Sequence, residues 1–160
     1  MYLAEPQRSQ RDQILVGFAQ KRYNLMDLNA LSSQVIKAAI NVHTSLGPGL
    51  LESVYQKCMA IELESLGINF AAEVQLPVYY RGRVITDDGF RIDIIVEKSI
   101  VVELKSVERI KAVHKKQLLT YLRLSDKPLG LLINFNESLL KSGITRIVNQ
   151  KRSIPFAESQ

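Results

Sequence analysis

The sequence predicts an α/β fold in which a central mixed β-sheet is flanked by helices. Segments rich in β-branched residues alternate with segments in which apolar residues recur at helical spacing. In addition, a continuous apolar run over residues 129–135 follows a predicted helix. Such a run is typical of a buried crossover strand that lies parallel to an earlier strand. With 160 residues, the chain is long enough for one domain with its own core.

Composition narrows the class of protein. The hydrophobic fraction of 46% and the charged fraction of 23% are those of an ordinary soluble globular protein. No apolar run approaches the roughly 20 residues of a membrane span, and the polar first residues do not resemble a secretory signal. The single cysteine, Cys58, excludes an internal disulfide and a cysteine-based zinc cluster. We therefore expect cytoplasmic residence and no membrane partner.

Apolar periodicity divides the chain into three parts. Residues 1–25 show no sustained apolar periodicity, so we expect a loosely ordered extension there. Residues 26–150 form the predicted domain, and residues 151–160 are expected to be a weakly ordered tail. The domain opens with helices over residues 28–46 and 50–66, which end at glycine-containing stops. The positions expected to face the core are Leu28, Leu31, Val35, Ala39, Val42 and Leu46 in the first helix, and Leu51, Val54, Cys58 and Ile61 in the second.

The second half of the predicted domain is rich in strands. We expect strands over residues 71–80, 84–85, 92–96 and 100–104. A turn is expected near Arg81-Gly82, and Asp87-Asp88-Gly89 leads into the hairpin of the last two strands. A helix over residues 110–124, the crossover strand and a last strand over residues 144–148 follow. The helix at residues 110–124 has one face that carries His114, Gln117, Leu118, Tyr121 and Leu122.

Three charged residues stand out on the predicted hairpin of residues 92–104. Glu103 and Lys105 are two residues apart, so they share a face of the strand, and Asp93 can reach the same face from the neighbouring strand. Two carboxylates and one amine suit phosphodiester chemistry assisted by Mg²⁺ or Mn²⁺. The alternative is a cross-strand salt bridge on a solvated sheet face.

The excess of positive charge is uneven. The net charge is +5, and residues 105–127 carry seven Lys and Arg residues against two acids. A basic stretch directly after the acidic cluster fits a polyanionic partner, and Arg109, Lys111 and Lys115 are its candidate backbone contacts. Alternatively, the stretch is a solvated helix face.

Five blocks of the sequence resemble the signature of the GxxExxY proteins, which are placed in the PD-(D/E)xK nuclease superfamily. The likeness covers about residues 28–149. One residue departs from it, since Ile92 stands where the superfamily name has proline. The blocks are Val42-His43-x-x-Leu46-Gly47-Pro48-Gly49-Leu50-x-Glu52-x-x-Tyr55, Arg91-Ile92-Asp93, Val102-Glu103-Leu104-Lys105, His114-x-x-Gln117-Leu118-Leu119-x-Tyr121-Leu122, and Gly130-Leu131-Leu132-Ile133-Asn134-Phe135-Asn136.

The resemblance implies a restriction-endonuclease-like fold with its active site at the opened end of two strands. By position, Asp93 and Glu103 correspond to the metal-binding carboxylates and Lys105 to the catalytic lysine. Leu104 would offer its backbone carbonyl to the metal, and Glu52 resembles a helix-borne acid that completes the site in RecB-like members.

Three further side chains are candidates to line the site. Gln117 and Tyr121 resemble the Gln-x-x-x-Tyr of RecB-like exonucleases. Tyr55 lies three residues after Glu52, on the same side of the predicted second helix. For both tyrosines a half-buried core position is the alternative.

The function expected from these observations is a Mg²⁺-dependent nuclease that acts on DNA, with exonuclease and endonuclease action as the two options. A domain of this size has little room for base readout, so strong specificity would require a partner or a homodimer. One alternative is a nucleic-acid-binding or assembly module that uses the fold without hydrolysis. The other is a structural domain in which the acids form an ion-pair network.

Overall fold

The computed structural model describes residues 10–150, and at residues 10–26, 87 and 88 it describes the backbone only. Five strands form one mixed sheet in the order β1-β2-β3-β4-β5, in which β3 and β4 are parallel and the other neighbours antiparallel. The predicted α/β class and the predicted parallel crossover strand are both confirmed. The elements are α1 (Gln10–Leu46), α2 (Glu52–Ser65), β1 (Phe70–Tyr80), β2 (Arg83–Val96), β3 (Ile100–Lys105), α3 (Ala112–Leu124), β4 (Leu129–Asn134), a 3-10 helix η1 (Leu140–Gly143) and β5 (Ile144–Val148).

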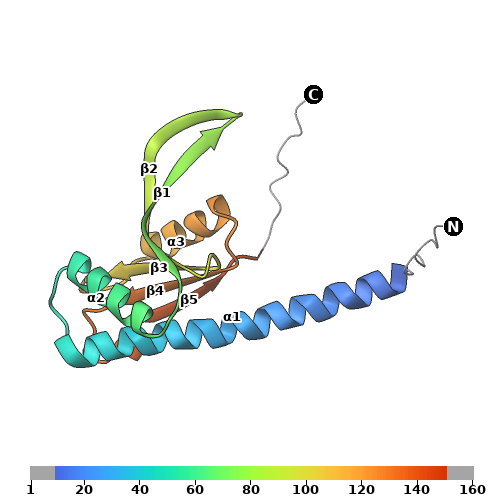
Figure 1. The fold of residues 1–160 in the computed structure, drawn as a ribbon. Coiled ribbons are helices and arrows are strands. Elements are labelled where there is room, and N and C mark those ends of the chain that lie inside the picture. The colour runs from blue at the N-terminus through green and yellow to red at the C-terminus, as the bar shows by residue number, and fades with distance from the viewer. Residues whose placement is uncertain (1–9, 151–160) are drawn as a thin grey trace.

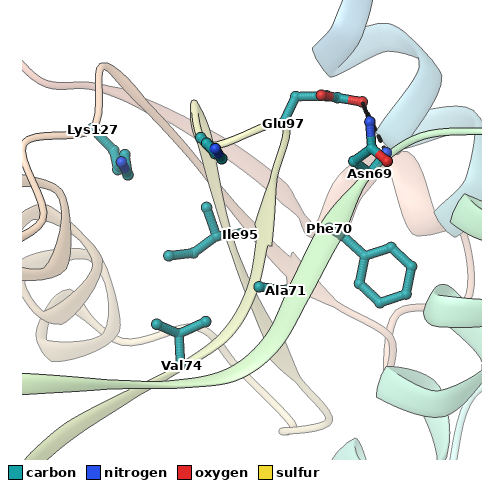
Figure 2. Close-up of a pocket in the computed structure, with 8 residues that line it drawn as sticks. Asn69, Phe70, Ala71, Val74, Ile95, Glu97 and Lys127 are labelled. Atoms are coloured by element: carbon teal, nitrogen blue, oxygen red, sulfur yellow. Dashed lines mark hydrogen bonds between the residues drawn. The ribbon is translucent and has the colours of Figure 1, made fainter.

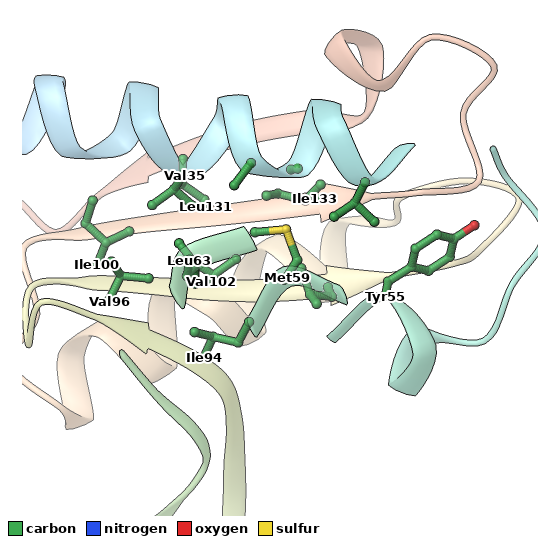
Figure 3. Close-up of a cluster of buried hydrophobic side chains, with 14 of the residues drawn as sticks. Val35, Tyr55, Met59, Leu63, Ile94, Val96, Ile100, Val102, Leu131 and Ile133 are labelled. Atoms are coloured by element: carbon green, nitrogen blue, oxygen red, sulfur yellow. The ribbon is translucent and has the colours of Figure 1, made fainter. Parts of the chain in front are cut away.

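Helices cover both faces of the sheet (Figure 1). On one face, α1 and α2 pack on the sheet through a large apolar cluster (Figure 3), to which α1 contributes Val35, α2 contributes Met59 and β4 contributes Ile133. On the other face, α3 packs through Leu118, Tyr121 and Leu122. Among the described residues, none of the helices combines the length and the apolar character that crossing a membrane requires.

The first helix is longer than the sequence predicts. It begins at Gln10, so residues 10–25 are helical rather than a loosely ordered extension, whereas residues 1–9 and the predicted tail at 151–160 lie outside the described residues. The stretch contains no proline and is rich in good helix formers such as Gln, Arg and Leu. Once the ordered part of the helix has formed, each added residue extends it by one hydrogen bond without a new nucleus. The lack of amphipathic periodicity therefore did not prevent helix formation.

The apolar face predicted for α2 is wrong except for Cys58, which is partly buried against the core. The residues that α2 buries are Tyr55, Met59 and Leu63, while Leu51 and Ile61 are 73% and 64% exposed. Two apolar stripes with helical spacing run along this segment, so periodicity alone does not distinguish them. The stripe that carries the aromatic ring faces the sheet and α1.

The turn near Arg81-Gly82 is confirmed, but Asp87-Asp88-Gly89 is a bulge within one continuous strand rather than a connection between two strands. In the register of β1 and β2, Leu76 pairs with Phe90 and Val78 with Thr86, so three residues of β2 lie opposite Pro77 alone. Proline has no N–H to donate to the ladder, which suits a position opposite a bulge. A Cβ on Gly89 would lie 2.8 Å from Thr86 Cγ2, which explains the glycine there.

Candidate active site

The site is built where β2 and β3 separate. Their pairing runs from Val96↔Ile100 to Ile94↔Val102 and then stops. Beyond it, the N–H of Leu104 donates to Asp93 Oδ2 at 2.8 Å, so a side chain takes the place of a backbone partner. The N–H and C=O of a strand residue point to the same side, so the Leu104 carbonyl is also directed toward Asp93.

Glu103 and Lys105, both on β3, lie beside Asp93 of β2. Lys105 Nζ donates to Glu103 Oε1 at 2.8 Å, and Glu103 is only 3% exposed. The second carboxylate oxygen, Glu103 Oε2, is buried and has no hydrogen-bond partner. A buried carboxylate oxygen without a partner is costly, so this position favours a proton or a cation.

The charges of the cluster are out of balance, because several carboxylates share one ammonium group. Burial, together with the negative charge of Asp93, raises the pKa of Glu103 to about 7. Burial also raises the pKa of Asp93, although the Leu104 N–H opposes the shift. Burial lowers the pKa of Lys105, but its hydrogen bond to Glu103 and the surrounding carboxylates outweigh this and raise the pKa above the ordinary value. Lys105 is therefore an ammonium at neutral pH, and the cluster attracts further positive charge.

Glu52 reaches the cluster from the first turn of α2. Its Oε1 accepts the N–H of Ser106 at 3.0 Å, directly after the end of β3, and Ser106 Oγ donates to the Leu50 carbonyl at 2.7 Å. The charge of Glu52 contributes to the raised pKa values of Asp93 and Glu103. Glu52 thus ties the N-terminus of α2 to the carboxyl end of β3.

The helix on the opposite face contributes Gln117 and Tyr121. Gln117 Nε2 donates to Tyr121 Oη at 2.6 Å, and the Tyr121 ring packs on Phe90 with centroids 5.4 Å apart. Burial, above all, and the nearby charge of Glu103 raise the pKa of the Tyr121 hydroxyl. Acids from β2, β3 and α2 and polar groups from α3 therefore meet at one end of the sheet.

The donor set fits a hard divalent cation, although the ligands are not fully assembled. Among the described residues, no group of three or more His, Cys, Asp or Glu side chains is gathered closely enough to hold an ion. Mg²⁺ does not need such a group, because it keeps several waters and takes one or two carboxylates. Asp93 and Glu103, whose Oε2 has no partner, supply two carboxylates, and the Leu104 carbonyl supplies a third oxygen ligand. Glu52 lies at the edge of the cluster, where it accepts the Ser106 N–H.

Tyr55 does not line the site. It is fully buried, stacks on Phe135 with ring centroids 4.2 Å apart, donates its hydroxyl proton to the Gly47 carbonyl at 2.6 Å and accepts the Leu50 N–H at 3.2 Å. Its hydroxyl thus fixes the loop between α1 and α2. Tyr55 is therefore a core aromatic residue, which was the alternative to a position lining the site.

The basic candidates lie next to the cluster in the chain but outside it. Arg109, Lys111 and Lys115 are exposed on the loop after β3 and the first turns of α3. The N–H of Lys111 donates to His114 Nδ1 at 3.1 Å, so that histidine serves as a local cap. These cations are free to contact a molecule that approaches from solvent.

Sequence reasoning missed the amides that hold the site. Gln56 Nε2 donates to the Asp93 carbonyl at 3.0 Å. The fully buried Asn134 bonds both backbone groups of Val107, with Oδ1 accepting the N–H at 3.0 Å and Nδ2 donating to the carbonyl at 2.8 Å. A polar residue inside the apolar run of residues 129–135 was the available signal for Asn134, whereas Gln56 gave none.

A cavity of ≈ 670 Å³ lies at the other end of the sheet, beside the turn between β2 and β3 (Figure 2). Val74 and Ile95 contribute apolar walls, and Lys127 lies at its edge. The Glu97 carboxylate is held by Asn69, with its Oε1 accepting the backbone N–H at 2.8 Å. None of the clustered acids lines this cavity, so it is separate from the candidate site.

Comparison with protein families finds a match over residues 29–147 to the family described as the PD-(D/E)XK nuclease superfamily. The matched stretch contains every residue of the cluster described above. Searches of curated proteins and of solved structures give no match.

Proposed function

The chain belongs to the PD-(D/E)XK nuclease superfamily, and on this premise we propose that it is a metal-dependent nuclease that hydrolyses phosphodiester bonds in DNA. The observation that supports this most is Glu103 Oε2, which is buried without a partner beside Asp93 and on the same strand as Lys105. In a structural ion-pair network, both oxygens of a buried carboxylate are expected to have partners. We further propose membership of the GxxExxY group within a RecB-like branch, because Glu52, Gln117 and Tyr121 surround the cluster.

Asp93, Glu103, Glu52 and the Leu104 carbonyl would hold the cation, which we propose to be Mg²⁺ or Mn²⁺. When bound, such an ion polarises phosphate oxygens and offsets their charge. These carboxylates would hold the ion at the end of β3, and the Leu104–Asp93 hydrogen bond restricts the rotation of the Asp93 side chain.

Lys105 is the catalytic lysine in this proposal. Its hydrogen bond to Glu103 Oε1 holds the amine at the cluster. There it would position or deprotonate the attacking water and offset the negative charge that develops on the phosphate in the transition state. Gln117 and Tyr121 close the α3 side and orient the nucleotide next to the scissile bond, while Arg109, Lys111 and Lys115 contact the flanking backbone. Binding should therefore weaken as salt rises.

The test is cleavage of linear, circular and single-stranded DNA and of RNA in Mg²⁺ or Mn²⁺. We expect degradation by the wild type and its loss, by a factor of at least about 100, in Lys105→Ala. Lys141→Ala, at an exposed position on η1, is the matched control and should cleave like the wild type. Preference for linear over circular DNA would support the exonuclease that we propose, and equal cleavage would reject it.

A non-catalytic nucleic-acid-binding module is the second candidate, because the described acids are not gathered into a three-ligand group. It predicts binding that does not depend on metal and is indifferent to Lys105→Ala. We also propose a cytoplasmic location, and a homodimer as the form that would extend base readout.

A further inference from the structure

The two-stranded ribbon of β1 and β2 extends beyond the rest of the sheet (Figure 1). Its distal part, residues 78–86, is called the arm here. Within the arm, Val78 pairs with Thr86, Tyr79 with Val84 and Tyr80 with Arg83, and Arg81-Gly82 forms the turn. A two-stranded ribbon without a covering layer is marginally stable by itself, so the arm calls for a functional explanation.

Strand β2 connects the arm to the candidate active site. β2 carries Asp93 at the point where it leaves β3 and Arg83 at its far end, which is at most about 33 Å along the strand. Its base is fixed, because Phe90 packs on Tyr121 of α3 and Ile92 is fully buried. A molecule held by the arm is therefore held at a defined distance from the cluster.

Both faces of the arm are exposed. Neighbouring residues of a strand point to opposite faces, and Tyr79 and Tyr80 are 58% and 62% exposed while Val84 and Ile85 are 49% and 59% exposed. In a sheet that only covers a core, one of these faces would be buried. A ribbon with large side chains on both faces suits a groove, where both walls contact it.

The charge of the arm favours a polyanion. The tip of the arm carries Arg81 and Arg83, whereas the next acids of the ribbon, Asp87 and Asp88, follow Thr86 at the base of the arm. The Arg81 guanidinium lies 5.5 Å from the centre of the Tyr80 ring. Arginine beside tyrosine offers bidentate contacts to phosphate and a planar surface for sugar and base edges. Two arginines per tip would repel each other in a contact between arms of two chains, which argues against self-association.

We propose that the arm binds duplex nucleic acid, entering a groove beside the scissile bond with Arg81 and Arg83 on the flanking phosphates. The inference rests on the proposed function, since it assigns to the same site a double-stranded substrate and a second point of attachment. The arm would keep the duplex aligned over Asp93 and Glu103.

The experiment measures binding of a fluorescent DNA duplex by the wild-type protein in EDTA, over a range of KCl concentrations. Arg81→Glu/Arg83→Glu should weaken binding at least about tenfold and reduce the salt slope by about 2. Lys37→Glu/Lys141→Glu makes the same change of charge at exposed positions of α1 and η1 and should have a much smaller effect. Tyr79→Ser/Tyr80→Ser should weaken binding while the slope stays unchanged.

Equal losses in the arm variant and the control variant would overturn the inference, and so would single-stranded DNA bound as tightly as duplex. If sedimentation shows a wild-type dimer that the arm variant loses, the arm is a contact between copies and the inference is wrong. Cleavage in Mg²⁺ is scored separately. Arm-dependent duplex binding without cleavage rejects the proposed nuclease alone, whereas cleavage with arm-independent binding rejects the inference alone.

Discussion

At the scale of single residues, Glu103 carries the conflict between stability and function. It is buried, one of its oxygens lacks a partner, and its pKa is raised to about 7. A carboxylate held in this way costs stability whenever it is charged, and natural proteins keep such groups where activity requires them. Lys105 offsets part of this cost but already serves several acids.

The first prediction concerns the pH dependence of stability in EDTA. The folded-state pKa of Glu103 is raised from an ordinary 4.5 to about 7, so the folded protein binds the proton more tightly than the unfolded chain. The stability from this group is fully present below pH 4.5 and is lost as the pH rises to 7, by on the order of 3 kcal/mol. Urea unfolding of the wild type and Glu103→Gln at pH 5 and pH 8 measures it.

In that comparison, Glu103→Gln should be the more stable protein at pH 8 and should show the shallower pH dependence, although it loses nuclease activity. Glu64→Gln, at an exposed position of α2, is the control and should follow the wild type. A wild type that gains stability from pH 5 to pH 8 relative to Glu103→Gln would show that the carboxylate is stabilised by its surroundings.

At the scale of elements, the connection from α1 to α2 explains the spacing of Gly49, Glu52 and Tyr55. Gly49 has φ +99°, which favours glycine, and Tyr55 fixes the same loop through Gly47 and Leu50. With the loop fixed, the first turn of α2 directs Glu52 to the end of β3. Gly49 therefore permits the turn, Tyr55 holds it in place and Glu52 reaches the site.

The second prediction follows from the position of Tyr55. Tyr55→Phe removes the partner of the Gly47 carbonyl and of the Leu50 N–H, and should lower the free energy of unfolding by about 1–3 kcal/mol. Cleavage well below the melting temperature should persist. Tyr80→Phe, on the exposed arm, should leave stability within about 0.5 kcal/mol of the wild type. Loss of cleavage by Tyr55→Phe at unchanged stability would assign Tyr55 to the site instead.

The third prediction concerns the segment after β3. Asn134→Ala leaves the N–H and the C=O of Val107 without their partner and should destabilise the protein by about 2–3 kcal/mol. Amide hydrogen exchange should rise in residues 106–111, which carry Arg109 and Lys111. In contrast, Asn136→Ala, at an exposed position, should leave exchange unchanged. Exchange that rises evenly over the whole domain would show that Asn134 has no local role.

At the scale of the whole molecule, features with a local cause were predictable from the sequence. The glycines after α1, the turn between β2 and β3, and the apolar run of β4 each follow from residues close together in the chain. The grouping of Asp93 with Glu103 and Lys105 was also predictable, because a hairpin and a two-residue spacing suffice.

Features decided by tertiary contacts were not predictable. Leu51 and Met59 mark two apolar stripes of α2, and only packing on the sheet decides which is buried. Asp88 and Gly89 are typical of a turn, but the strand opposite, with its Pro77, accommodates them as a bulge. Gln56 and Asn134 hold the site through bonds to backbone groups far away in the sequence, for which a single sequence gives no pattern.

The last prediction concerns the response of the whole domain to a divalent cation. The cluster carries more negative than positive charge, so Mg²⁺ or Mn²⁺ should bind the folded protein and raise its melting temperature. At a concentration about ten times the dissociation constant the gain is roughly 1.4 kcal/mol, or about 3–5 °C for a domain of this size. Asp93→Asn should abolish the rise, because it removes a carboxylate that Glu103 Oε2 cannot replace. Asp27→Asn, at an exposed position of α1, should keep it. An equal rise in the two variants would place the cation elsewhere on the molecule and leave the Asp93–Glu103 pair as an ion-pair network around Lys105.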